Sequence, residues 1–181
     1  MKQILTISVE DNRRWYDHIG IMIGSPKITI YLPEKEYASL SIESGTGNVE
    51  IFNDMQIESV DIALSTGDIS IANMTTDNMK LSVSTGDITV ASVNCDNFHS
   101  TGSTGDITLE NVIVTELLSI ERSTGKVKFE GCDAGEILIK TTTGKVNVPQ
   151  ITNGGKCEIS TRTGDIKVAI VGAKESITTV E

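Results

Sequence analysis

Apolar and polar residues alternate along most of the chain, and the alternation restarts at a regular interval. A Thr-Gly pair marks each restart, and the glycines of successive pairs lie 19 or 20 residues apart. The seven pairs are Thr46-Gly47, Thr66-Gly67, Thr85-Gly86, Thr104-Gly105, Thr124-Gly125, Thr143-Gly144 and Thr163-Gly164. Spacing this regular indicates one structural unit that repeats along the chain.

Apolar residues occupy the same positions in every unit when the units are aligned on this glycine. The positions seven and five before the glycine, and two, four and seven after it, hold 33 apolar residues among 35, whereas random placement at the mean composition would give about 13. In the third unit these residues are Met79, Leu81, Ile88, Val90 and Val93. A spacing of two with many β-branched residues is typical of β-strands. The units are therefore expected to consist of strands.

Each unit also contains two predicted corners. The apolar phase breaks at the Thr-Gly pair, where glycine tolerates the positive φ that a tight corner often requires. A second corner is expected in the polar stretch before the next unit, such as residues 75–78 and 94–97, because Asp and Asn favour turns.

Strands that return every 19 or 20 residues with the same side inward can stack as coils. We therefore predict an all-β fold, a single-stranded, right-handed parallel β-solenoid (β-helix) with about seven coils. Residues 1–39 are expected to form irregular N-terminal strands and a loop, as a first coil or cap that includes Trp15 and Tyr16. Residues 40–181 form the repeats, and both parts make one domain. The pattern leaves open whether a coil has two or three faces.

Composition narrows the range of partners. The chain has 15 Lys and Arg residues against 25 Asp and Glu residues, a net charge of −10, which argues against binding to nucleic acid or anionic lipid. No stretch reaches the roughly 18 apolar residues needed to cross a bilayer, so we expect a soluble chain without direct membrane insertion. Both ends cut through a unit, which could allow self-association through open solenoid ends.

The threonine before each glycine is the same residue in all seven units. These hydroxyls could form an array that binds ice or another ligand. The alternative, which we favour, is a structural ladder in which each hydroxyl bonds to its neighbour, with the side chains turned inward or to the rim of the corner. The glycines and threonines are thus predicted to be structural turn residues.

Acidic residues follow the glycine in several units. Asp68, Asp87 and Asp106 are expected to stack about one rung apart, and a bound calcium ion could relieve the repulsion between their charges. The alternative is that these acids are solvated, keep the protein soluble and discourage lateral sheet association.

No catalytic constellation is evident, and we expect neither enzymatic activity nor a cofactor. His18 and His99 are isolated from each other in the sequence. Cys132 and Cys157 occupy core positions, whereas Cys95 is expected to be a partly exposed thiol at the second corner. A polysaccharide-acting enzyme is disfavoured because a coil length fixed to within one residue leaves no room for the long loops that build a cleft.

The units Ser65-Thr66-Gly67-Asp68-Ile69, Ser84-Thr85-Gly86-Asp87-Ile88 and Ser103-Thr104-Gly105-Asp106-Ile107, after Ile28-Thr29-Ile30-Tyr31-Leu32-Pro33, resemble a bacterial family of β-strand-repeat proteins described as adhesins and also called the toastrack domain. The resemblance covers roughly residues 3–181. It implies a domain held at the cell envelope, outside the cytoplasm, with no catalytic residues to carry over.

The leading functional hypothesis is a non-catalytic, rigid interaction module, an adhesin or an envelope-associated binding or sensing domain. Its partner would be a protein or glycan ligand, with the acidic outer faces as the expected contact surfaces. The alternative is a cytoplasmic, bactofilin-like scaffold that assembles end to end through its open edges.

Overall fold

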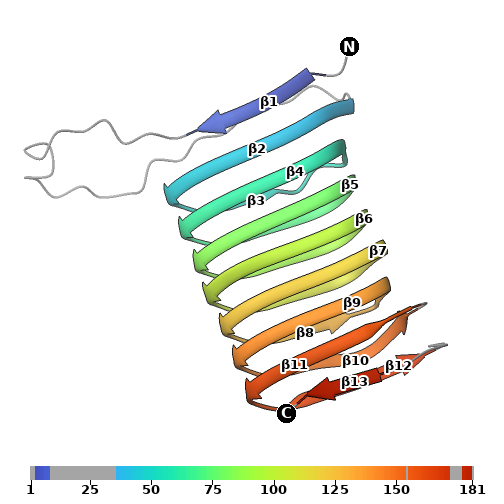
Figure 1. The fold of residues 1–181 in the computed structure, drawn as a ribbon. Helices are drawn as coiled ribbons and strands as arrows, with labels where there is room; N and C mark the ends of the chain where they lie inside the picture. Colours follow the sequence, from blue (N-terminus) through green and yellow to red (C-terminus); the bar gives the residue numbers. More distant parts are fainter. Residues whose placement is uncertain (1–2, 9–35, 154, 172–176, 181) are drawn as a thin grey trace, which may run out of the picture.

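The computed structural model describes residues 3–8, 36–153, 155–171 and 177–180. These residues form strands and no helix. Figure 1 shows them as a stack of similar coils. The strands are β1 (Gln3–Ser8), β2 (Glu36–Thr46), β3 (Val49–Ile51), β4 (Met55–Thr66), β5 (Ile69–Thr85), β6 (Ile88–Thr104), β7 (Ile107–Thr124), β8 (Val127–Glu130), β9 (Cys132–Thr143), β10 (Val146–Asn153), β11 (Cys157–Thr163), β12 (Ile166–Val171) and β13 (Ile177–Val180).

The strands of successive coils pair in parallel and in register. Ile69 of β5 pairs with Ile88 of β6, which in turn pairs with Ile107 of β7. Residues separated by one sequence repeat therefore lie directly above one another, which is the arrangement that the repeat predicts. The predicted parallel β-solenoid with about seven coils is confirmed.

The coil of β5 has three main paired stretches, which are residues 69–72, 74–76 and 78–83. The pairing omits Asn73, Asp77 and Ser84, and it includes Thr85 just before the Thr-Gly corner. The bend at Asp77 lies in the predicted second corner. The bend at Asn73 was not predicted, and its residue has φ 57°, as do its equivalents Ser92 (53°) and Asn111 (51°). Asn is one of the residues that enters this left-handed region most easily.

The strands end at the threonine of each Thr-Gly pair and resume two residues after the glycine, as the break in apolar phase predicted. Gly86 has φ 144°, a value that side chains disfavour. A Cβ there would also overlap the carbonyl oxygen of Gly67 in the preceding coil. The amide of Gly86 donates to the carbonyl of Thr104 at 2.9 Å, so the corners stay bonded from coil to coil.

The core is a continuous column of apolar side chains along the solenoid axis. The aligned apolar positions supply most of it, and Ile88, Ile107 and Phe129 are fully buried. Burial of one such side chain is worth about 1.5–3 kcal/mol. A continuous apolar interior therefore stabilises each coil through its neighbours.

The three cysteines are all buried and free of disulfides. This confirms the core positions of Cys132 and Cys157 but corrects the prediction for Cys95, which is only 3% exposed. Asp96, the next residue, is omitted from the pairing at the second corner, so the corner turns one residue later than expected and Cys95 points inward. Burial, reinforced by the charge of Asp96, raises the pKa of the Cys95 thiol to about 12.

The N-terminal region is described only in part. β1 pairs in parallel with β2, and Ile7 lies beside Ile42. The predicted cap residues Trp15 and Tyr16, and also His18, lie outside the described residues.

Candidate functional site

Four features of the solenoid surface are candidates for function: the row of Asx residues at the Thr-Gly corner, the exposed threonines beside it, and two shallow grooves. All four lie on residues that occupy equivalent positions in successive coils.

The acidic residues after the glycines form a hydrogen-bonded ladder along the solenoid. In four successive coils, the Oδ1 atom of the Asn or Asp after the glycine accepts a hydrogen bond from the backbone N–H of the equivalent residue in the next coil. The bonds run from Asp68 N to Asn48 Oδ1 (2.9 Å), Asp87 N to Asp68 Oδ1 (2.9 Å), Asp106 N to Asp87 Oδ1 (2.7 Å) and Lys126 N to Asp106 Oδ1 (2.8 Å). Asp and Asn suit this position because they supply a short acceptor for a corner amide.

This ladder gives the predicted calcium stripe a structural role that sequence reasoning missed. One carboxylate oxygen of Asp68, Asp87 and Asp106 is used by the neighbouring coil. Among the residues that the structure describes, no group of three or more His, Cys, Asp or Glu side chains is placed to hold a metal ion. The presence of Asn48 in the same column was the signal that an amide oxygen serves here as well as a carboxylate does.

The threonine column lies on the outside of the corner. All seven threonines, from Thr46 to Thr163, are exposed, and no hydrogen bond joins two of their hydroxyls within the described chain. The expected hydroxyl ladder is therefore not formed. The backbone makes the connection instead, because the carbonyl oxygen of Thr85 accepts the N–H of Gly67 at 3.0 Å. The threonine hydroxyls remain open to solvent or to a ligand.

A groove of about 380 Å³ crosses four coils just before the Thr-Gly corner. We call it the hydroxyl groove. Its walls carry the hydroxyls of Ser44, Ser65, Ser82, Ser84 and Thr101, and Glu43 lies at one end. It is hollow because Gly45, Ala63 and Gly102 have little or no side chain.

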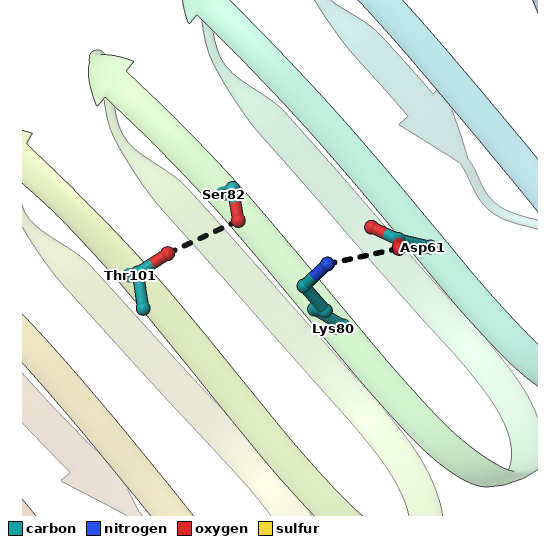
Figure 2. A network of polar contacts seen from close by, with 4 residues as sticks. All are labelled: Asp61, Lys80, Ser82 and Thr101. Carbon is teal, nitrogen blue, oxygen red and sulfur yellow. Dashed lines mark hydrogen bonds and ion pairs between the residues drawn. The ribbon is translucent and has the colours of Figure 1, made fainter.

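The hydroxyls of the groove are held in fixed positions along the strands. Figure 2 shows Ser82 and Thr101 on adjacent coils, with their side-chain oxygens 3.0 Å apart. On the same face, Lys80 Nζ lies 3.0 Å from Asp61 Oδ2 in the preceding coil. Both pairs bridge adjacent rungs, so the spacing of the polar groups follows the spacing of the coils.

Arg122 in the next coil pairs with Gly102, a residue of the hydroxyl groove, and sequence reasoning did not identify it. Its side chain is 4% exposed, and Nη1 donates to the carbonyl oxygen of Val83, two coils earlier, at 3.1 Å. It fits because Gly102 lies between them, where a Cβ would overlap the guanidinium. Its Nε and Nη2 atoms have no hydrogen-bond partner among the described residues.

Two opposing effects act on the pKa of Arg122. Burial lowers the pKa of its guanidinium, whereas the negative charges of Asp87 and Asp106 act in the opposite direction. The signal in the sequence was an Arg in one unit at the position where the preceding unit has Gly. The buried cation is therefore within electrostatic reach of the acidic ladder.

A second groove, of about 280 Å³, lies just after the Thr-Gly corner in the last three described coils. We call it the basic groove. Its polar side chains are Lys126, Lys128, Lys145, Asn147, Asp165 and Lys167, and Val127 and Val146 lie beneath them. Lys145 Nζ is 2.9 Å from Asp165 Oδ2, and Lys128 Nζ is 2.6 Å from Glu130 Oε1. The groove is cationic in an otherwise acidic chain.

The remaining predicted groups lie apart from these surfaces. His99 is half-buried and pairs with Lys80 and Ser119 in the strands on either side. Burial raises the pKa of the Cys132 and Cys157 thiols, which points to packing rather than to reactivity.

A comparison with protein-family models matches residues 2–180 to the family described as Toastrack DUF4097. The chain belongs to the toastrack family. This confirms the resemblance that the Ser-Thr-Gly-Asp units indicated. The toastrack family has no established function, so membership identifies the architecture and leaves the role of the two grooves to be inferred. No match was found among curated proteins or among solved structures. Within the described part of this toastrack domain, no helix has the length and apolar character to cross a membrane.

Proposed function

We propose that this toastrack domain is a non-catalytic, rigid interaction module that binds an extended, hydroxyl-rich ligand, such as a glycan, along the hydroxyl groove. The observation that carries the proposal is the groove itself, which crosses four coils and is lined by hydroxyl groups and small side chains. It differs from the acidic outer faces that the sequence suggested as contact surfaces.

The chemistry of the groove suits a ligand that both donates and accepts hydrogen bonds. A serine or threonine hydroxyl can do either, and sugar hydroxyls can do the same. Ser82 and Thr101 repeat such a group at adjacent rungs, about 4.8 Å apart along the axis. A polymer can therefore make several weak contacts at once, which raises its overall affinity.

The rigidity of the solenoid favours binding by a groove of this kind. The strands on its floor carry Leu64 and Val83, which are 4% and 1% exposed, so the backbone below the hydroxyls is fixed by core packing. A surface that is already ordered loses little conformational entropy when a ligand binds.

The proposed location is outside the cytoplasm, at the cell envelope, where a domain of this kind could act in adhesion or sensing. This part of the proposal rests on the family resemblance of the Ser-Thr-Gly-Asp units. Fractionation of cells that express the native gene tests it, because a cytoplasmic signal would contradict it.

A glycan-binding assay with matched variants tests the role of the groove. Ala63→Leu fills the hollow, and Thr101→Val removes a hydroxyl while keeping the shape of the side chain. Thr89→Val makes the same chemical change outside the groove and serves as the control. We expect both groove variants to lose at least about tenfold in affinity and the control to bind as the wild type does. Equal binding by all three, or no binding across a broad glycan panel, would reject the proposal.

The end-to-end scaffold remains the second candidate. It is favoured by the unpaired edge at each end of the sheet. Among the described strands, β1 pairs only with β2 and β13 pairs only with β11. Unpaired strand edges can template the addition of another chain. Filaments in electron micrographs, lengthening with protein concentration, would support the scaffold in place of the binding module.

A further inference from the structure

One edge of the solenoid changes the sign of its charge halfway along its length. We define the corner edge as the residues one and three positions after each Thr-Gly glycine. In the first four coils its charged residues are all acidic: Glu50, Asp68, Asp87 and Asp106. In the last three coils they are Lys126, Lys128, Lys145 and Lys167, with Asp165 as the one acid. The two halves therefore carry net charges of −4 and +3, the latter from four lysines less one aspartate.

The corner edge is a continuous surface. The hydrogen-bonded ladder holds Asp68, Asp87, Asp106 and Lys126 in one row. The second row follows strand pairing without a break, from Thr108 to Lys128 and then to Asn147 and Lys167. The basic groove is lined by residues of both rows, which shows that the two rows share one surface in the last three coils.

We propose that the corner edge is a self-complementary interface through which two copies of this chain associate side by side and antiparallel. With the twofold axis between the fourth and fifth coils, Asp106 of one copy faces Lys126 of the other, and Asp87 faces Lys145. Asp68 faces the coil that carries Lys167 and Asp165, so the attraction comes mainly from the two central pairs. A parallel arrangement would place like charges opposite each other, so the charge pattern selects the antiparallel one.

A second copy fits this edge better than an anionic polymer does. A polyanion would be attracted to the basic half but repelled by the acidic half of the same row. Another copy of the chain offers the opposite polarity at the same rung spacing. Thr89 and Thr108 have short side chains, so the surface between the charged residues does not obstruct the approach of a second copy.

The ion pairs within one copy do not prevent its lysines from pairing with a second copy. Lys126 Nζ is 3.9 Å from Asp106 Oδ2, the outer limit of an ion pair, and their side chains are 68% and 46% exposed. Lys145 is paired more closely with Asp165, at 2.9 Å, and both are 65% exposed. Exposed pairs of this kind are weak, typically below about 1 kcal/mol, so a facing carboxylate can compete for the lysines.

The interface is small and is held mainly by charge attraction, so association should depend on the salt concentration. Six rungs at about 4.8 Å give a strip roughly 29 Å long, and a strip two residues wide falls well short of the roughly 800 Å² per partner of a standard interface. The attraction acts over about 30 Å at 0.01 M salt and only about 3 Å at 1 M salt. We expect a reversible dimer at low salt that dissociates at high salt.

Charge-swap variants test the proposal by sedimentation velocity. Lys126→Glu with Lys145→Glu makes the edge wholly acidic in its ladder row, and Asp87→Lys with Asp106→Lys makes it mainly basic. Lysine occurs naturally in this column, but here it also removes two ladder acceptors, so circular dichroism and thermal unfolding are used to verify that this variant is folded. Each variant alone is expected to dimerise at least about tenfold more weakly than the wild type, whereas an equimolar mixture of the two forms a heterodimer. This rescue requires that the ladder rows of the two copies face each other, whereas the antiparallel direction follows from the dimerisation of the wild type, whose parallel pairing would oppose like charges.

Two further variants separate the interface from the fold. Lys80→Glu with Lys156→Glu makes the same change in net charge, at lysines whose ion pairs with Asp61 and Glu158 lie away from the edge, and it should dimerise as the wild type does. Asp87→Asn with Asp106→Asn keeps the ladder acceptors but removes their charges, and it should weaken the dimer while the protein stays folded.

Three outcomes would overturn the proposal. The first is a wild-type protein that stays monomeric at high protein concentration and low salt. The second is equal dimerisation by the edge variants and the Lys80 and Lys156 control. The third is a monomer that binds polyphosphate through the lysines of the basic groove, which would assign the basic half to a polyanion. A loss of the glycan binding proposed above would leave this result unchanged, because the hydroxyl groove lies on the other side of the corner.

Discussion

The Oδ1 atom of Asp87 accepts a hydrogen bond from the backbone N–H of Asp106, the equivalent residue in the next coil, at 2.7 Å. This bond joins two coils at the point where the strands are interrupted. The same bond recurs at successive corners, so the acidic column is part of the fold as well as of the surface.

Asp87→Ala is expected to lower the free energy of unfolding by about 1 kcal/mol, because the amide of Asp106 loses its acceptor. Asp87→Asn should have a much smaller effect, since Asn48 performs the same role in the first described coil. Urea unfolding followed by circular dichroism measures both. Equal destabilisation by Asn and Ala would show that the charge, and not the acceptor, is what matters.

Gly86→Ala is expected to destabilise the protein by about 2–4 kcal/mol, because it combines an unfavourable positive φ with overlap of the new Cβ and a neighbouring carbonyl. Gly45→Ala is the matched control, since nothing lies within 4 Å of a Cβ at Gly45 and its φ is outside the strained range. The control should change stability by less than about 0.5 kcal/mol. Thermal unfolding of the two variants measures both effects. Equal losses of stability in Gly86→Ala and Gly45→Ala would contradict the account.

Arg122→Met is expected to leave stability unchanged or to increase it, because two guanidinium nitrogens are buried without partners and an apolar chain of similar length removes that cost. Gly102→Ala should be destabilising, because its methyl group would overlap both the same guanidinium and the carbonyl oxygen of Val83. In the double variant the cost of Gly102→Ala should shrink. Additive effects in this double-mutant cycle would mean that the two residues do not interact.

The Cys95 thiol is expected to resist alkylation at pH 8 in the native protein and to react rapidly in urea. Its pKa of about 12 lies above the unfolded value of 9.0, so the unfolded state releases its proton first as pH rises. Stability from this group is therefore complete below pH 9 and is lost between about pH 9 and 12. Rapid native-state labelling, or alkaline stability of the wild type equal to that of Cys95→Ala, would contradict the burial.

The repeat made most of the fold predictable, because Ile69, Ile88 and Ile107 had to lie on one interior surface once the spacing was recognised. The finer geometry was not predictable in the same way. The bend at Asn73 depends on φ, and no apolar pattern marks it. Cys95 was misplaced by one residue, since a polar corner does not reveal which of its residues turns outward.

The candidate surfaces were harder to predict than the core. The outward direction of Thr85 and its neighbours depends on how the corner turns, and the alternation of apolar residues ends before that point. The ladder of Asp87 and the fit of Arg122 over Gly102 both join residues of different coils. Such contacts depend on the register between coils at atomic detail, which the sequence pattern specifies only coarsely.

The central claim is that successive coils stack in register along one axis. Spin labels on a single outward column test it directly, and Ser41, Asp61, Lys80 and Glu158 belong to one such column through unbroken strand pairing. With one label at Glu158, electron-electron distances to Lys80, Asp61 and Ser41 should be roughly 19, 24 and 29 Å, a gain of about 4.8 Å for each coil. Distances that do not increase in equal steps would contradict the stacked solenoid.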